Sequence, residues 1–258
     1  MLEALTSLAL VCGEAEEAVE LLTYVSACQL RHIAIEFSGE LGTPELWNHL
    51  CRALAAHVSH SSLRRLQLAN DFPVDEDGLE EVGAVKFDAI RPLLAFHGIT
   101  SLNLNIPLGL DLDDPCLGEL ARAFPAVENL DLYKASVQHS PQATLAGIAA
   151  CAEHYLRISE ISLQVDAMKI KTTPSESPRV RPSDRRVRLD FYNSPINGPR
   201  AVASKLYKMF PKAVSASGCD KSEERSEMGL WDEVYDFVLR LGSGKLSADE
   251  ESRGPNYF

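Results

Sequence analysis

Apolar residues recur along the chain in one arrangement, at the first, fourth and sixth places of a six-residue stretch. The stretch Val127–Leu132 (VENLDL) is an example. In six such stretches the fourth place falls at residues 8, 33, 66, 102, 130 and 161, so the steps are 25, 33, 36, 28 and 31 residues. Alternating apolar and polar residues predict a half-buried strand, and recurrence at such steps is typical of repeat proteins. We therefore predict a series of similar units, each with a short strand.

Segments with helical periodicity lie between these strands. Residues 14–27 place apolar side chains on one helical face, with acidic residues early in the segment, where they suit the helix dipole. Thr43 precedes Pro44, a hydroxyl N-cap followed by proline at the first helical position. We expect Asp114 and Ser140, each followed by proline, to cap two later helices, and Pro92 to mark a kink or a helix end. Strands that alternate with helices predict a parallel sheet with helices on its other face.

The pattern weakens after Leu163. Residues 172–183 contain three prolines and predict an exposed insertion. A strand resumes with Val187 in the fourth place, although Asp184 occupies the first place, and Val214 starts or centres a last strand. Residues 230–241 form an amphipathic pattern that predicts a capping helix. We expect one domain over residues 1–241 and a disordered tail over 242–258.

Three features together carry a family resemblance. They are the repeated strand motif, the Phe-Pro step before a strand at Phe124 and Phe210, and the terminal pattern from Trp231 to Val238. With them the chain resembles leucine-rich repeat proteins, and more narrowly the repeat region of fungal F-box-type proteins. The resemblance implies an α/β fold, an irregular solenoid or horseshoe with parallel strands on the concave face and helices on the convex face.

The chain departs from the pattern of this family in two ways. The Asn or Cys expected three places after the sixth motif position is replaced, for example by Gly13, Ser38, Asp71 and Pro107. Steps of 31 to 36 residues also exceed the usual 20 to 29. An F-box would precede the repeats and is not seen in this sequence. The substrate-receptor role in a ubiquitin ligase that the resemblance implies therefore needs an F-box partner or a longer gene product.

Composition and charge restrict the classes of partner. The net charge of −12 argues against non-specific binding to nucleic acid or to an anionic membrane. The six cysteines include no C-x-x-C pair, which favours reduced thiols in a cytoplasmic or nuclear protein. No run approaches the roughly 18 apolar residues of a membrane helix. The basic residues between Lys169 and Arg188 form a solvated loop by default, but could also be a docking site for an acidic partner or a localisation signal.

No catalytic constellation can be assembled from the sequence. His57 and His60 share a helix end but lack a third metal ligand nearby, and Cys51 follows an inward-facing leucine, where cysteine is usually a small buried hydrophobe. Asp111 and Asp113 belong to an acidic loop before a helix, for which a divalent cation is the less favoured interpretation. We expect no enzyme activity, cofactor or metal.

The strand geometry provides the main functional hypothesis. If the fourth and sixth places face the core, the third, fifth and seventh places face the open side of the sheet. Side by side, these residues would form an extended polar surface suited to protein recognition, with Tyr133 as an aromatic anchor. The alternative is a truncated or diverged repeat fragment without binding activity of its own. The residues selected for the concave face are His32, Arg65, Gln67, Asn103, Asn105, Asn129, Asp131, Tyr133, Gln164, Arg186 and Arg188.

Overall fold

A computed structural model describes residues 4–38, 43–70, 84–106, 109–132, 140–168, 185–217 and 225–244, without the side chains of 225–228. Its centre is one sheet of eight strands that are all parallel and follow one another in chain order. The strands are β1 (Ser7–Cys12), β2 (His32–Phe37), β3 (Arg65–Asn70), β5 (Ser101–Asn105), β7 (Asn129–Leu132), β8 (Glu160–Leu163), β9 (Val187–Asp190) and β10 (Ala213–Ser217).

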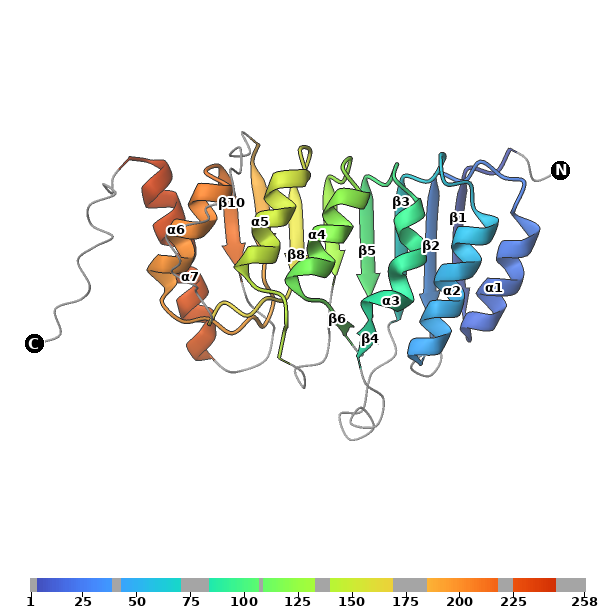
Figure 1. Cartoon of the computed structure of the whole chain (residues 1–258), viewed down its shortest axis with the longest axis horizontal. Helices are drawn as coiled ribbons and strands as arrows, with labels where there is room; N and C mark the ends of the chain where they lie inside the picture. The colour runs from blue at the N-terminus through green and yellow to red at the C-terminus, as the bar shows by residue number, and fades with distance from the viewer. Residues whose placement is uncertain are drawn as a thin grey trace, which may run out of the picture.

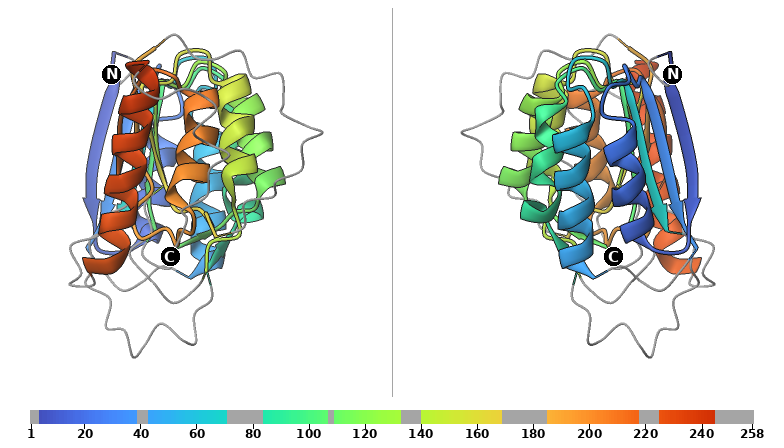
Figure 2. Two further views of the ribbon diagram at one scale, coloured as in Figure 1. Left: turned by 90° about the vertical axis from the view of Figure 1, so that its left-hand side faces the viewer. Right: turned by 90° about the vertical axis from the view of Figure 1, so that its right-hand side faces the viewer.

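Helices cover one face of this sheet (Figures 1 and 2). They are α1 (Ala15–Tyr24), α2 (Pro44–His57), α3 (Phe87–Ile90) with the 3-10 helix η2 (Arg91–Ala95), α4 (Asp114–Ala123), α5 (Leu145–His154) and α6 (Pro199–Met209). Two two-residue strands, β4 (Val85–Lys86) and β6 (Leu110–Asp111), pair beside the carboxyl ends of the large sheet. The predicted α/β class, with parallel strands alternating with helices, is confirmed. Pro92 lies where α3 gives way to η2, as expected.

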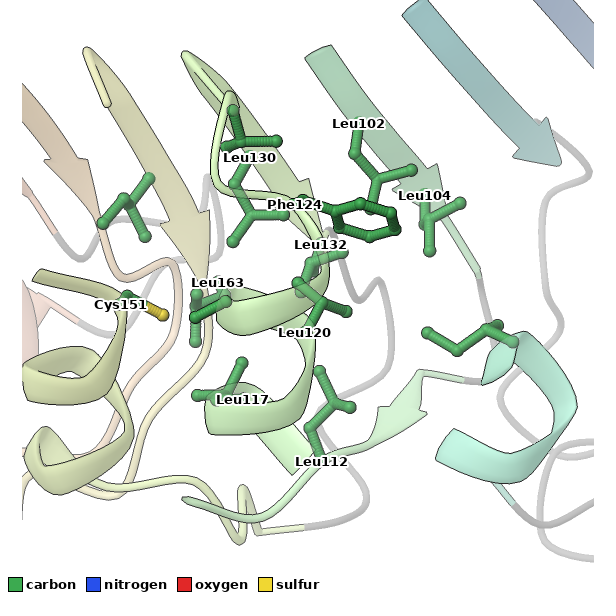
Figure 3. Packing of buried hydrophobic residues seen from close by; sticks show 14 of the residues in the cluster. Leu102, Leu104, Leu112, Leu117, Leu120, Phe124, Leu130, Leu132, Cys151 and Leu163 are labelled. Carbon is green, nitrogen blue, oxygen red and sulfur yellow. The ribbon is translucent and has the colours of Figure 1, made fainter. Parts of the chain in front are cut away.

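The core lies between the sheet and the helices because the repeated motif places its apolar residues in register. Ile33 pairs with Leu66, Leu66 with Leu102, Leu102 with Leu130, and Leu130 with Ile161. All five are at most 1% exposed. Figure 3 shows Leu102, Leu130 and Leu163 beside side chains of α4 and α5. Burial of each such side chain contributes about 1.5–3 kcal/mol relative to exposure.

Aromatic rings occupy the same place in four of the turns that lead from a helix to a strand. Each ring is at most 1% exposed and stands three residues before a buried apolar residue. In three of the turns the backbone N–H of that residue donates to the carbonyl of the aromatic residue, at 3.0–3.1 Å. The sequence motif identified two of these turns, and the structure adds two more. The four residues are Phe96, Phe124, Tyr155 and Phe210.

Two predicted helix caps are wrong. The N-cap of α4 is Asp113, whose carboxylate accepts from Cys116 N at 2.8 Å, and Asp114 is already the first residue of the helix. The N-cap of α5 is Thr144, four residues after the predicted Ser140, and its hydroxyl accepts from Ala146 N at 3.1 Å. The carboxylate before proline predicts the cap of α4 one residue too late in the chain. The hydroxyl before proline predicts the cap of α5 four residues too early.

Asp114 instead joins α4 to the start of α5. Its carboxylate accepts from Thr144 N at 2.6 Å, from Thr144 Oγ1 at 2.8 Å and from Gly147 N at 2.9 Å. The helices approach so closely that a Cβ on Gly147 would lie 2.7 Å from Leu117 Cδ1 and 2.8 Å from Asp114 Oδ1. Asp114 thus accepts from N–H groups at the amino end of a neighbouring helix, where Gly147 N also donates to Thr144 O at 3.1 Å.

The predicted register of the β9 motif is also wrong. Ile161 pairs with Leu189, so Leu189 and not Val187 occupies the fourth place of this unit. The first place then belongs to Arg186, and the sixth to the buried Phe191. Val187 is buried too, which makes the two frames hard to distinguish from apolar pattern alone.

The last helix, α7 (Arg225–Gly242), includes the predicted capping segment and packs against α6 and β10. Trp231 stacks on Phe191 with ring centroids 4.9 Å apart, and its Nε1 donates to Ser194 O at 3.0 Å. Tyr235 OH donates to the backbone carbonyl of Val214 in β10 at 2.9 Å. The predicted insertion at 172–183 and residues 245–258 of the predicted tail lie outside the described residues, and the domain boundaries remain a prediction.

Candidate binding surface

Two rows of side chains, most of them polar, cross the sheet face opposite helices α1–α6, here called the open face. In β2, β3 and β5 the residues of this face alternate with buried apolar residues. Strand pairing aligns the third places of the motif in a first row and the fifth places in a second. The first row is Ser7, His32, Arg65, Ser101, Asn129, Glu160 and Arg188, and the second is Ala9, Ala34, Gln67, Asn103, Asp131, Ser162 and Asp190.

The structure brings most of the predicted surface residues together in these rows. Asn105 ends β5 and Gln164 directly follows β8, so both lie at the carboxyl end of the face. Arg186 is exposed but precedes β9. Tyr133 lies outside the described residues. The seven predicted residues within the rows are His32, Arg65, Gln67, Asn103, Asn129, Asp131 and Arg188.

Asp131 is the centre of a hydrogen-bonded cluster on the open face. Asn103 Nδ2 donates to its Oδ2 at 3.0 Å, and Tyr192 OH donates to its Oδ1 at 2.7 Å. Tyr192 follows β9 and reaches β7, two strands away in the sheet. Ser162 of the intervening strand β8 is only 5% exposed. The phenol of Tyr192 therefore provides an aromatic side chain near the middle of the polar rows.

Tyr192 has an unusual backbone conformation. Its φ is 44°, in the left-handed region that non-glycine residues rarely adopt. Its N–H donates to Asp190 Oδ1 at 3.1 Å, so the two carboxylates of Asp190 and Asp131 hold its backbone and its side chain. Sequence reasoning missed this residue because it used the wrong β9 register. In the correct register Tyr192 occupies the seventh place, the same place as Tyr133 in its unit.

The pKa values of two side chains in this cluster, Asp131 and Tyr192, are raised. Burial raises the pKa of Asp131 above its ordinary value of 3.8, and the nearby carboxylates of Glu160 and Asp190 raise it further, while the Tyr192 hydrogen bond lowers it. Burial raises the pKa of Tyr192 as well, with a further rise from its hydrogen bond to Asp131. Tyr192 is therefore a hydrogen-bond donor throughout the neutral range.

The first row carries most of the exposed charge. Arg188 pairs with Glu160 at 3.6 Å, and Ser7 Oγ lies 3.5 Å from His32 Nδ1. Arg65 is exposed, and its side chain forms no ion pair or hydrogen bond within the described part of the chain. Exposed ion pairs contribute little to stability, so this row is available for other partners.

One pocket of about 330 Å³ lies at the carboxyl ends of β7 and β8. Leucines from β6, β7 and β8 line it together with Lys86, Asp111, Gln142 and Gln164. Its size is at the low end of the range for small-molecule sites. Parallel sheets usually bind ligands where the strand order reverses, but the large sheet here keeps chain order throughout. The pocket therefore does not lie at a reversal of strand order, where ligands of parallel sheets usually bind.

The thiols and acidic groups show little sign of reactive chemistry. Burial raises the pKa of Cys51 to about 12, and the same effect, with the Asp114 charge, raises that of Cys151 to about 12. Such thiols stay protonated at neutral pH and are weak nucleophiles. Within the described ranges, no group of three or more His, Cys, Asp or Glu side chains is placed to hold a metal ion. None of the helices in those ranges has the length and apolar content needed to cross a bilayer.

Comparison with known proteins gives no family for this chain: no family model matches it, and neither does any curated protein sequence.

Proposed function

We propose that this protein is a non-enzymatic binding module that recognises another protein on the open face of its sheet. The observation that carries the proposal is the alignment of two rows of side chains from seven adjacent strands, mostly polar from β2 onward, on the face opposite α1–α6. Because the rows are in register, one partner can contact side chains from several strands at once. A sheet is also a rigid support, which limits the entropy lost on binding.

The chemistry of the face favours a protein partner. Exposed amides such as Gln67 and Asn129 donate and accept hydrogen bonds and match polypeptide backbone groups. Tyr192 and the arginines Arg65 and Arg188 belong to the residue types that often dominate protein interfaces. Since the rows carry both signs of charge, a partner with complementary charges would be selected for orientation as well as affinity.

The proposal includes a more specific architecture. We infer a leucine-rich repeat solenoid with the open face as its concave side, from the recurring motif and the chain-order sheet. The resemblance to F-box-type proteins suggests that the partner is a target for ubiquitin ligation, in the cytoplasm or the nucleus. That role requires ligase contacts made by another protein or by a longer product.

Affinity capture from the source cell tests the proposal with two matched variants. Gln67→Trp places a bulky side chain in the second row without changing charge. His49→Trp places the same side chain at an exposed position on α2, on the opposite side of the sheet. Both variants must first match the unfolding midpoint of the wild-type protein. We expect a partner captured by wild type and His49→Trp but lost, by about tenfold or more in affinity, from Gln67→Trp.

The other outcomes separate the remaining hypotheses. Equal capture by all three proteins would place recognition elsewhere and reject the open face. Ligase subunits among the specifically lost proteins would support the ubiquitin pathway. Absence of any specific partner would favour the diverged repeat fragment.

A further inference from the structure

The amino ends of the strands lie together at one edge of the sheet, at the top of Figure 1, because all strands run in the same direction. We call this the amino edge and define it as residues 26–32, 59–65, 97–101, 125–129, 156–160, 185–188 and 211–213. It contains eight lysine and arginine side chains but only two carboxylates, Glu128 and Glu160. The basic residues are Arg31, Arg64, Arg65, Arg157, Arg185, Arg186, Arg188 and Lys212, and all are exposed.

This basic edge contrasts with the charge of the whole chain, which is −12. At the opposite edge, Asp111 and Asp190 end β6 and β9, and Glu36 is the last residue but one of β2. The protein is therefore dipolar along the direction of its strands. Screening in physiological salt limits such fields to about 8–10 Å, so a small ligand at the amino edge experiences mainly the arginines.

Several of these arginines have no charged partner of their own. Arg157 pairs with Glu128 at 2.6 Å and Arg188 with Glu160 at 3.6 Å. Arg64 donates only to the carbonyls of Ser61 and Leu63, which leaves its charge uncompensated. Three of the other five side chains form no ion pair or hydrogen bond among the described residues, and these are Arg31, Arg65 and Arg186.

The arginines form two groups on the edge. Arg31 and Arg64 are neighbours across β2 and β3, since Arg64 N donates to Arg31 O at 2.9 Å. Arg186 and Arg188 lie at the start of β9, where Arg188 N donates to Ser159 O at 2.8 Å. Four strand spacings separate β3 from β9. At about 4.8 Å each this is roughly 19 Å, the length of about six residues of extended polypeptide.

We propose that the amino edge binds an acidic, extended segment of the protein partner, with one group of carboxylates at β2–β3 and a second about six residues away at β8–β9. Arg65 and Arg188 belong to both this edge and the open face, so the inference rests on the proposed function and adds the chemistry of the partner. A nucleic acid or an anionic membrane is less well matched. Each extends far beyond the edge and meets the negative remainder of the protein.

The test uses a fluorescent peptide, Glu-Glu-Ser-Gly-Ser-Gly-Glu-Glu, and its Gln-for-Glu counterpart, in an anisotropy titration. We expect the acidic peptide to bind and its affinity to fall as NaCl rises from about 50 to 300 mM, whereas the Gln peptide should not bind. Arg65→Glu/Arg186→Glu should weaken binding by about tenfold or more. The matched variant Arg52→Glu/Arg122→Glu changes two exposed arginines on α2 and α4 and should stay within about twofold.

Equal weakening by both double variants would show an effect of net charge and overturn the proposal. An eight-nucleotide single strand or phosphatidylserine vesicles that bind more tightly than the peptide, and lose binding in the edge variant, would also overturn it. Gln67→Trp separates this inference from the proposed function, because it should retain the peptide. If the peptide fails to bind, but Gln67→Trp still fails to capture the partner that wild type captures, only the acidic-segment inference is rejected. If the peptide binds and Gln67→Trp captures the same proteins as wild type, the open face is rejected as the binding surface. The proposal for the amino edge is then retained.

Discussion

The two faces of the sheet are built from alternate residues of the same strands, yet their chemistry differs at most positions. In β7, Leu130 is 0% exposed beneath the helices, whereas Asn129 next to it is exposed on the open face. Apolar burial on the covered face stabilises the folded protein. Exposed side chains of the open face remain solvated and contribute little to stability. The comparison indicates that stability depends mainly on the covered face, whereas most substitutions on the open face should change stability little.

The strongest test of this contrast compares neighbouring substitutions. Leu130→Ala should lower the free energy of unfolding by about 2–5 kcal/mol, because it removes buried methyl groups and leaves a cavity. Asn129→Ala should change it by about 0.5 kcal/mol or less, as is usual for surface positions. Chemical denaturation followed by circular dichroism measures both. Similar losses for the two variants would contradict the division between the faces.

A second substitution asks whether the covered side depends on apolar contacts alone. Asp114→Ala removes a carboxylate that accepts from Thr144 N, Thr144 Oγ1 and Gly147 N. Gly147 N keeps its bond to Thr144 O at 3.1 Å, whereas Thr144 N and Oγ1 lose their acceptor. We expect a loss of about 1–3 kcal/mol in the same denaturation experiment. Asp111→Ala, at an exposed residue of β6, is the control and should stay within about 0.5 kcal/mol. A loss no larger than that of the control would assign Asp114 no structural role.

Two tyrosines depart from this contrast, because one contributes to stability on the open face and the other is a buried polar group in the core. Tyr192→Phe removes a hydroxyl that donates to Asp131, and should cost about 1.5–3 kcal/mol at neutral pH. Tyr155 is 1% exposed in the core, and its hydroxyl has no hydrogen-bond partner among the described residues. Tyr155→Phe should therefore be neutral or stabilise by up to about 1 kcal/mol. Differential calorimetry would contradict both assignments if the core variant lost more stability than the open-face variant.

The smallest expected effect is a pH dependence on the open face. The folded-state pKa of Asp131 is raised above 3.8, so the folded protein binds this proton more tightly than the unfolded chain. The stability that Asp131 contributes is thus fully present below pH 3.8 and is lost as the pH rises through the folded-state value. As the pH rises through this range, the free energy of unfolding of Asp131→Asn should therefore increase relative to that of wild type. Parallel stability curves from pH 3.5 to about 7 would reject the shift.

Local features of this fold could be predicted from sequence because their causes lie within a few residues. The Thr43 cap is an example: its hydroxyl accepts from Leu46 N three residues later. The apolar places of the motif likewise identified strands whose core residues are now seen to pair in register. The α/β class follows from these local patterns, since strands alternating with helices have few other arrangements.

The two cap errors are local, since Asp113 and Thr144 each bond a backbone N–H within three residues. The other errors came from contacts between distant residues. The β9 register depends on the pairing of Leu189 with Ile161, and two buried residues, Val187 and Leu189, fit the same local pattern. Tyr192 meets Asp131 across 61 positions of sequence. No local signal predicts such a contact, although a correct register would have given Tyr192 the seventh motif place, which Tyr133 holds in its own unit. The amino edge was missed for the same reason, because its arginines come from separate turns.

The chain-order sheet has a further consequence for local opening of the protein. β10 has α7 against it, whereas β1 pairs with β2 alone within the described residues. Each unit packs mainly on the units before and after it, so opening that starts at β1 breaks few contacts elsewhere. Backbone amides of β1 should therefore exchange with deuterium faster than those of β5 and β7, and exchange should slow progressively from the first strand toward the middle of the sheet.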